Sequence, residues 1–230
     1  MKPITVVLAD DATVVRKGLV FLLNHEPDIE VVGEAGDGRE AIRQVKELKP
    51  DVVVMDIRMP NLNGIEATGQ IRRAYPEVRV VVLTNAAEEE YVFRLLKAGA
   101  EGYVLKNAAA EDLVSAIRAV VLGEKYLSPS VSSILIREYL KNADGSLPPD
   151  SPEVLSPRER EVLQLIAEGH SGPEIAEILS MSARTVNVHR EHIRQKLDLR
   201  STAEMVKYAI RKGLTQIDPT EERLEDHPEE

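Results

Sequence analysis

The chain has 230 residues and is 43% hydrophobic, which is enough to bury one large core or two smaller ones. It has no cysteine, which excludes disulfides and a Cys-based zinc site, and no apolar run reaches the roughly 20 residues of a membrane span, so we expect a cytoplasmic protein without a signal peptide. The net charge of −10 argues against nucleic acid as a partner except at residues 155–214, which carry 10 Lys and Arg against 8 Asp and Glu.

Up to about residue 122, short apolar runs alternate with helical patterns, and the connections between the runs are too long for hairpins. This order predicts a parallel sheet with crossover helices, and the Val-rich and Ile-rich runs suit strands that are buried on both faces. We expect an α/β fold of the flavodoxin-like, doubly wound type, with five parallel strands in the order 2-1-3-4-5. The expected strands lie near residues 4–9, 29–34, 51–56, 79–84 and 102–105, and helices are expected after Thr13, Gly38, Asn63, Glu88 and Ala110.

Five side chains fall where the apolar runs end, namely Asp10, Asp11, Asp56, Thr84 and Lys106. Each alone could be a helix cap, a turn residue or a solvated strand end, but all five lie at the edge of the sheet where α/β proteins bind ligands. Three clustered carboxylates repel one another unless a cation neutralises them, and oxygen ligands at a half-open site favour Mg²⁺. The pattern therefore predicts a magnesium site.

The same residues predict a phosphorylation chemistry. A carboxylate such as Asp56 can accept a phosphoryl group as an acyl phosphate, and the metal and Lys106 would offset the charge of that group. Thr84 could then donate a hydrogen bond to a phosphoryl oxygen, and the backbone carbonyl of Arg58 could complete the metal sphere.

The run from Met55 to Gly64 (MDIRMPNLNG) and the run Gly102–Lys106 (GYVLK) resemble the receiver domain of bacterial two-component response regulators, over essentially residues 3–122. The resemblance implies that Asp11, Asp56 and the Arg58 carbonyl bind Mg²⁺ and that a sensor histidine kinase is the phosphodonor. It also implies a switch pair, Thr84 and Tyr103, which reshapes the face made by the fourth helix, fifth strand and fifth helix.

A connector is expected over residues 123–154. Leu127-Ser128-Pro129-Ser130 can start a short helix that runs through Ile134, Leu135 and Leu140, and the Gly and Pro residues of 144–149 then break it. We divide the chain into a first domain at 1–122, this linker, a helical domain at 155–214 and an acidic tail at 215–230, which we expect to be disordered.

Ser156, Pro157 and Glu159 form a capping box that opens a helix, and a second short helix near 173–179 leads through a tight turn to a third helix capped by Ser182. This is helix-turn-helix spacing. One face of the third helix offers Asn187, Val188 and Glu191, side chains that suit adenine, the thymine methyl and cytosine respectively. Residues expected to face DNA phosphates are Arg184, Thr185, His189, Arg190, Arg194 and Lys196.

The runs Leu155–Leu163 (LSPREREVL), Glu174-Ile175-Ala176, Thr185-Val186-x-x-His189 and Lys196-Leu197 resemble the LuxR-type helix-turn-helix of NarL/FixJ response regulators, over about residues 153–214. That family often has Lys at the positions of Asn187 and Glu191, so we expect a different DNA preference here. The resemblance implies a homodimer on two related DNA half-sites. The dimer helix would carry Met205, Val206, Ala209 and Ile210, although these residues also fit a purely structural core.

Our leading hypothesis is a phosphorylation-controlled transcription regulator, in which phosphorylation of Asp56 frees the DNA-binding domain or promotes its dimerisation. A receiver that acts through protein contacts alone is one alternative. A phosphatase of the haloacid dehalogenase type is another, but it would need a second Asp two residues after the nucleophile, where this chain has Arg58. We therefore expect no turnover enzyme.

Overall fold

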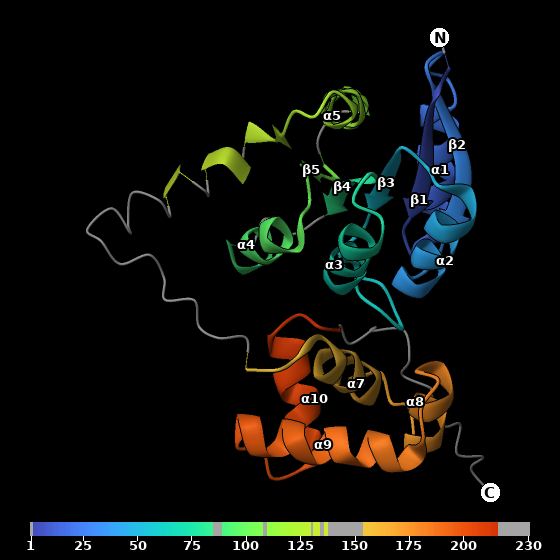
Figure 1. Cartoon of the computed structure of the whole chain (residues 1–230). Helices are drawn as coiled ribbons and strands as arrows, with labels where there is room; N and C mark the ends of the chain where they lie inside the picture. Colours follow the sequence, from blue (N-terminus) through green and yellow to red (C-terminus); the bar gives the residue numbers. More distant parts are fainter. Residues whose placement is uncertain are drawn as a thin grey trace, which may run out of the picture.

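The computed structural model describes residues 2–84, 89–107, 110–129, 131–133, 136–137 and 154–215. Its first part, the α/β unit, is a parallel sheet with helices on both faces (Figure 1). The strands are β1 (Ile4–Ala9), β2 (Ile29–Ala35), β3 (Val52–Met55), β4 (Arg79–Thr84), β5 (Gly102–Leu105) and β6 (Tyr126–Leu127). Their order is β2-β1-β3-β4-β5-β6, which confirms the predicted arrangement of the first five strands.

The sixth strand was not expected, so the prediction of five strands was incomplete. Tyr126 donates its backbone N–H to Glu101 and Ser128 donates to Tyr103, which places β6 parallel to β5 along its free edge. A strand of two residues has no periodicity that a sequence could reveal. A helix was predicted to begin at Leu127, but Leu127 belongs to β6, and the helical residues are Pro129, 131–133 and 136–137. Ile134, Leu135 and Leu140 lie outside the described residues.

The two faces of the sheet bury different sets of side chains, because successive residues of a strand point to opposite sides. Val7 and Ala9 of β1 share a core with the helices α2 (Gly38–Leu48), α3 (Gly64–Ala74) and α4 (Glu89–Ala98). Val6 and Leu8 face α5 (Ala110–Val121) and α1 (Thr13–Leu23) on the other side. The strands are therefore buried on both faces, as their apolar runs predicted.

Gly64 allows the start of α3 to approach the end of β3. A Cβ atom at this position would lie 1.9 Å from the backbone oxygen of Asp56, so no larger residue fits without moving the backbone. Asn63 caps the helix by accepting hydrogen bonds from Ile65 and Glu66, both at 3.1 Å. The loop between β3 and α3 is thereby fixed at both ends, directly beside Asp56.

The second part, the helical unit, consists of α7 (Pro157–Ala167), α8 (Gly172–Ile178), α9 (Ala183–Leu197) and α10 (Thr202–Arg211) around a separate apolar core. The Ser156 capping box is present, and the Ser182 hydroxyl accepts from Thr185 N at 3.1 Å, which confirms both predicted caps. Among the described residues, no helix is long and apolar enough to cross a membrane.

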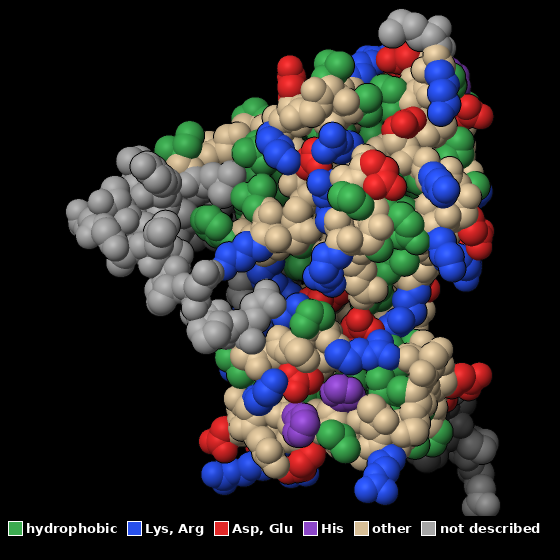
Figure 2. Space-filling view, in the orientation of Figure 1, with side chains coloured by type: hydrophobic (Ala, Val, Ile, Leu, Met, Phe, Trp, Pro, Cys, Tyr) green, Lys and Arg blue, Asp and Glu red, His purple; other side chains and the backbone are tan. Residues whose placement is uncertain are grey.

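The helical unit packs against the α/β unit through α7, whereas α9 runs along the far side (Figure 1). Hydrogen bonds and ion pairs join α7 to α2, α3 and the loop between β3 and α3. Figure 2 shows basic and acidic side chains interspersed over both units on the face in view. No single basic face dominates that view, in keeping with the small positive charge of residues 155–214.

Candidate functional site

The predicted pocket is present at the carboxyl edge of the sheet. Asp10 follows β1, Asp56 follows β3 and Lys106 follows β5, and both carboxylates are buried. The Lys106 ammonium lies 2.6 Å from an Asp10 oxygen and 2.9 Å from an Asp56 oxygen. The other oxygens accept backbone N–H groups, from Ala12 to Asp10 and from Ile57 to Asp56. One cation therefore bridges two buried acids that would otherwise repel each other.

Burial controls the ionisation of this pocket. It raises the pKa of Asp56, an effect that the neighbouring Lys106 charge only partly offsets. Burial also raises the pKa of Asp11, and the Asp10 charge adds to that effect. For Lys106, burial would lower the pKa, but the Asp56 and Asp10 carboxylates outweigh it and raise the value. The lysine stays charged at neutral pH.

The donor set suits a divalent cation. Asp10, Asp11 and Asp56 each offer a carboxylate oxygen, and these oxygens lie within 4.8 Å of one another. Asp11 is exposed while the other two are buried, so the cluster is open to solvent on one side. Hard oxygen ligands at a half-open position are the kind of site that Mg²⁺ occupies with part of its water shell retained.

The predicted switch pair lies on adjacent strands. Tyr103 is fully buried in the core on the α2, α3 and α4 side of the sheet. Thr84 ends β4 and pairs with Leu105, but its side chain lies outside the described part of the chain. The backbone oxygen of Tyr103 accepts the hydrogen bond from Ser128 N, which joins this strand directly to the linker.

The predicted base-reading residues lie on the outer side of α9. Asn187, Val188 and Glu191 are all exposed, and the α/β unit does not cover them. Arg184 and Thr185 are also exposed, at the start of the same helix. This face is free to enter a DNA groove.

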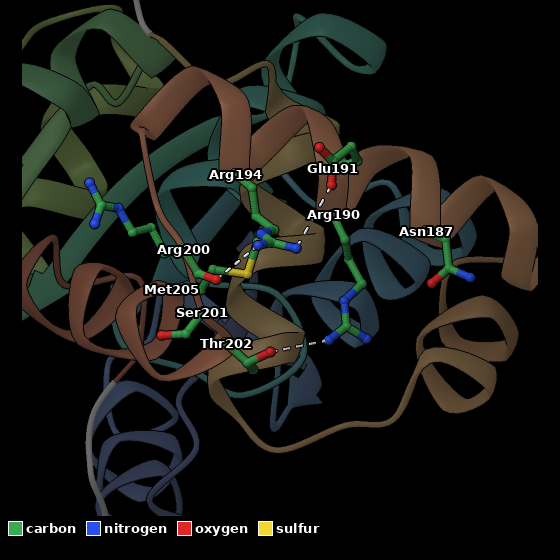
Figure 3. Close-up of a pocket in the computed structure, with 8 residues that line it drawn as sticks. All are labelled: Asn187, Arg190, Glu191, Arg194, Arg200, Ser201, Thr202 and Met205. Atoms are coloured by element: carbon green, nitrogen blue, oxygen red, sulfur yellow. Dashed lines mark hydrogen bonds and ion pairs between the residues drawn. The ribbon is translucent and has the colours of Figure 1, made fainter.

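The other residues predicted to contact DNA phosphates differ in their burial and in the hydrogen bonds that their side chains already make within the helical unit. Lys196 donates to Glu159 at 2.7 Å, and Arg194 donates to the backbone oxygen of Arg200 at 2.8 Å, so both are tied within the helical unit. Arg190 is half-buried and makes a long contact of 3.5 Å with Thr202 (Figure 3). His189 is half-buried as well.

A set of contacts that the sequence did not suggest joins the two units. The Gln164 side chain of α7 is fully buried: its oxygen accepts from the Asn63 backbone N–H at 3.1 Å and side-chain amide at 2.8 Å, and its amide donates to the Met59 carbonyl at 3.0 Å. Arg160 donates to both oxygens of Glu66, at 2.5 and 3.0 Å. The loop that follows Asp56 is therefore held by the helical unit.

Two family models match the chain. Residues 6–118 match the response regulator receiver domain, and residues 153–209 match the bacterial regulatory proteins of the luxR family. The oxygen regulatory proteins NreC of Staphylococcus carnosus strain TM300 and Staphylococcus haemolyticus strain JCSC1435 are both 44% identical over 212 residues, which cover 91% of this chain and 98% of theirs. The chain belongs to the two-component response regulators with a LuxR-type DNA-binding domain.

Solved response regulators share this architecture. RcsB of Salmonella typhimurium is 31% identical over 90% of this chain and 98% of its own, with a TM-score of 0.57. The RcsB–DNA complex covers the same shares at 30% identity and a TM-score of 0.57, and ChrA of a heme-sensing two-component system is 34% identical over 93% of this chain and 100% of its own, with a TM-score of 0.52. The protein is thus a DNA-binding transcription regulator and not a turnover enzyme. This excludes the alternative of a haloacid dehalogenase-type phosphatase.

Within this response regulator, the predicted dimer helix is divided between core and surface. Met205 and Ala209 of α10 are 1% and 0% exposed and pack in the core of the helical unit, as the structural alternative expected. Val206 and Ile210 are half-buried. Of the four predicted dimer residues, Val206 and Ile210 are therefore the two that remain accessible to a partner.

The interface residues Arg160, Gln164 and Glu66 were missed because each looks like an ordinary polar residue on an amphipathic helix. The sequence held one weak indication of this interface. Gln164 interrupts the apolar run of α7, and a polar residue at such a position would ordinarily be expected to face water. The face formed by α4, β5 and α5 was expected to transmit the switch. From this face, Arg94 of α4 donates a 3.5 Å hydrogen bond to the Lys212 carbonyl of the helical unit.

Proposed function

We propose that Asp56 is the phosphoacceptor and that a sensor histidine kinase is the donor. A carboxylate oxygen of Asp56 attacks the phosphorus of the donor phosphohistidine; the P–O bond forms as the P–N bond breaks, and the imidazole leaves with the bonding pair and takes up a proton. The product is an acyl phosphate. Lys106, 2.9 Å from the Asp56 carboxylate, is placed to offset the charge of the bound phosphoryl group.

We assign Mg²⁺ to the carboxylates of Asp10, Asp11 and Asp56 and to the main-chain carbonyl of Arg58. Receiver domains bind Mg²⁺ at an acidic pocket, and the clustering of the three carboxylate oxygens supports this assignment. When bound, the ion would supply positive charge to the phosphoryl oxygens. Thr84 and Tyr103 would report the phosphorylated state. Thr84 would donate a hydrogen bond to a phosphoryl oxygen, and the Tyr103 ring would respond from its place in β5, where it packs in the core.

For the output, we propose that α9 enters the major groove and that phosphorylation favours a homodimer on two related half-sites. The exposed side chains of Asn187, Val188 and Glu191 support the first part. The RcsB structures, which include a complex with DNA and two RcsB dimers bound to two parallel DNAs, support the second by similarity. The phosphorylated regulator would act in the cytoplasm.

The domain bounds that we propose are 1–122 for the receiver, 123–154 for the linker, 155–214 for the DNA-binding domain and 215–230 for the acidic tail. The family matches at 6–118 and 153–209 support the first and third. The tail lies outside the described residues except for Thr215.

Phosphorylation need not uncover α9, because the docked receiver leaves its base-reading face exposed. The receiver instead holds α7 through the loop that follows Asp56. We infer that phosphorylation rearranges this loop, alters the position of the DNA-binding domain and so permits two copies to meet on DNA. A change of arrangement, not the opening of a covered surface, would then be the controlled step.

The observation that carries the phosphorylation proposal is the bridge of Lys106 between Asp10 and Asp56. We expect acetyl phosphate with Mg²⁺ to add one phosphoryl group to the wild type and none to Asp56→Asn, as measured by intact-protein mass spectrometry. Asp198→Asn is the matched control, because Asp198 lies at the end of α9 with φ 50°, a conformation that Asn adopts equally well. Equal labelling of Asp56→Asn would refute the assignment.

A further inference from the structure

The segment between β1 and α1 carries two of the three acids of the pocket but lacks the usual helix cap. Asp10 and Asp11 lie in this segment, and the N-cap residue of α1 is Ala12, whose side chain cannot accept a hydrogen bond. The first turn of α1 also has no acidic residue. The position of the two carboxylates therefore depends on other contacts to this segment.

Arg16 of α1 supplies such a contact. Its Nη1 group donates to the Asp10 carbonyl oxygen, and its Nε group donates to a Glu34 carboxylate oxygen at 3.2 Å. The Arg16 side chain is only 15% exposed, so water competes little for these bonds. Because the two donors belong to one planar guanidinium, their relative positions are fixed. Arg16 therefore joins the end of β1 to Glu34 of β2.

Glu34 is a firm anchor for Arg16. It lies beside Leu8 of β1 in the parallel sheet, and its other carboxylate oxygen accepts from Lys17 at 2.7 Å. The hydrogen bond from Lys17 lowers the pKa of Glu34, and Arg16 adds to this effect, whereas partial burial opposes it. Glu34 therefore stays ionised at neutral pH and holds the guanidinium as a charged partner.

The bond from Arg16 reaches the peptide that links the two acids. The Asp10 N–H donates to the Ala35 carbonyl at 3.0 Å, and an Asp10 carboxylate oxygen accepts from Ala12 N at 2.9 Å. The Asp10 carbonyl belongs to the next peptide unit, and since this unit is planar, a fixed oxygen also fixes the Asp11 N–H and the direction of the chain at Asp11. Asp11 is exposed, so the backbone has a large part in where its carboxylate lies.

We propose that Arg16 is a positioning residue for Mg²⁺, because it fixes the peptide between Asp10 and Asp11. The inference rests on the proposed metal site and extends it, since Arg16 was not among the predicted site residues. Arg16 would not bind the ion; it acts through a backbone oxygen on the two residues that do. Groups that orient metal ligands typically change metal affinity about 10–100-fold when they are removed.

Charge and geometry predict opposite effects at this position. The Arg16 guanidinium places a positive charge beside Asp10, so removal of its charge alone should make Mg²⁺ bind more tightly. Loss of the fixed peptide should instead make Mg²⁺ bind more weakly. Arg16→Lys keeps the charge but replaces the planar group, with its two fixed donors, by a single flexible ammonium. The substitutions Arg16→Gln and Arg16→Lys therefore separate the two effects.

The test measures Mg²⁺ binding to the full chain by isothermal titration calorimetry, without a phosphodonor. We expect Arg16→Gln and Arg16→Lys each to bind Mg²⁺ about tenfold more weakly than the wild type. Lys17→Gln is the matched control, because Lys17 is the next residue and pairs with the same Glu34 but is exposed. Its affinity should stay within about twofold of the wild type, since salt screens exposed charges.

A second measurement separates positioning from damage to the fold. We expect the Mg²⁺ concentration that gives half of the maximal rate of labelling by acetyl phosphate to rise about tenfold in Arg16→Lys. The maximal rate should stay near that of the wild type, because the bonds of Arg16 go to Asp10 and Glu34. A labelling rate that falls by the same factor at every Mg²⁺ concentration would indicate damage to the fold and would overturn the proposal.

Two further results would overturn it, and they are distinguishable. If the wild type binds Mg²⁺ and both Arg16 variants bind it at least as tightly as Lys17→Gln does, Arg16 has no positioning role while the metal site stands. If the wild type binds no Mg²⁺, the proposed metal site fails and the role of Arg16 fails with it. Unchanged circular dichroism of Arg16→Lys would show that a lost affinity does not reflect unfolding.

Discussion

The Arg160 guanidinium of α7 and the Glu66 carboxylate of α3 form a bidentate ion pair across the two domains, with N···O distances of 2.5 and 3.0 Å. Only 13% of the Arg160 side chain and 5% of the Glu66 side chain are exposed. Two charges removed from water attract each other strongly, but removing either partner leaves the other charge buried and uncompensated. The contact therefore specifies how the domains dock.

Arg160→Ala should release the DNA-binding domain from the receiver. Loss of the guanidinium leaves Glu66 buried with the more distant Arg94, 3.8 Å away, and uncompensated buried charges typically cost about 3–5 kcal/mol. Small-angle X-ray scattering should show a larger radius of gyration than that of the wild type.

Arg43→Ala is the control for this experiment, because Arg43 is 61% exposed and pairs only with Glu40 within α2 among the described contacts. We expect its radius of gyration to equal that of the wild type. The double variant Glu66→Met/Arg160→Met should recover docking in part, since two apolar residues leave no unpaired charge. An unchanged radius for Arg160→Ala would show that this pair does not hold the domains together.

Gln164→Leu should loosen the loop that follows Asp56. The substitution keeps the side-chain volume but leaves the Met59 carbonyl and the Asn63 N–H without the partners that Gln164 provides, at a cost of about 1–3 kcal/mol for each buried group. Hydrogen exchange in the peptide over residues 57–64 should become faster. Gln195→Leu on the exposed side of α9 should leave that peptide unchanged. If both variants exchange like the wild type, the helical domain does not restrain the loop.

The acidic pocket could be predicted from the sequence and the domain interface could not, for a physical reason. Asp10, Asp56 and Lys106 converge because parallel strands must end at one edge of the sheet, so their places follow from local patterns. Gln164 and Glu66 acquire their roles only when two separately folded domains meet. Their helices were correctly predicted, but no periodicity within one domain encodes the partner surface of another.

Lys106→Met should make the receiver less stable as the pH rises. Burial already raises the pKa of Asp56, and the Lys106 charge opposes that effect, so its loss should raise this pKa further. A carboxyl whose pKa is higher in the folded state retains protons that the unfolded chain releases, so stability falls as the pH rises through the folded value. Urea unfolding should therefore show a larger loss, roughly 3 kcal/mol, at about pH 8 than at about pH 5.

Added Mg²⁺ should restore much of the stability that Lys106→Met loses at the higher pH, because the cation replaces the missing positive charge among the three carboxylates. Lys125→Met is the matched control, since that side chain is 63% exposed and lies 3.6 Å from Glu101, away from the pocket. It should change stability by less than about 0.5 kcal/mol and show no Mg²⁺ effect. A pH-independent loss in Lys106→Met would contradict the proposed charge balance.

Glu159→Gln should weaken the DNA-binding domain at neutral pH but not in acid. Burial alone would raise the pKa of Glu159, but hydrogen bonds from Lys196 at 2.7 Å and from the Ser156 backbone outweigh it and hold the pKa low. A carboxyl with a lowered pKa stabilises the fold above its unfolded value, about 4.3, and this contribution is lost as the pH falls through the folded value.

The loss at about pH 7 should be near 1 kcal/mol, which is below the roughly 1.5–3 kcal/mol typical of a hydrogen bond to a charged group, because the Lys196 side chain is 43% exposed. Urea unfolding of the two proteins should then converge as the pH falls below the folded pKa. Glu174→Gln tests whether a cap alone gives the same effect, because Glu174 accepts from Ser171 N at 2.7 Å and has no lysine partner among the described contacts. If Glu159→Gln lost no more stability than Glu174→Gln at neutral pH, the Lys196 ion pair would contribute nothing, and Lys196 would be free to contact DNA.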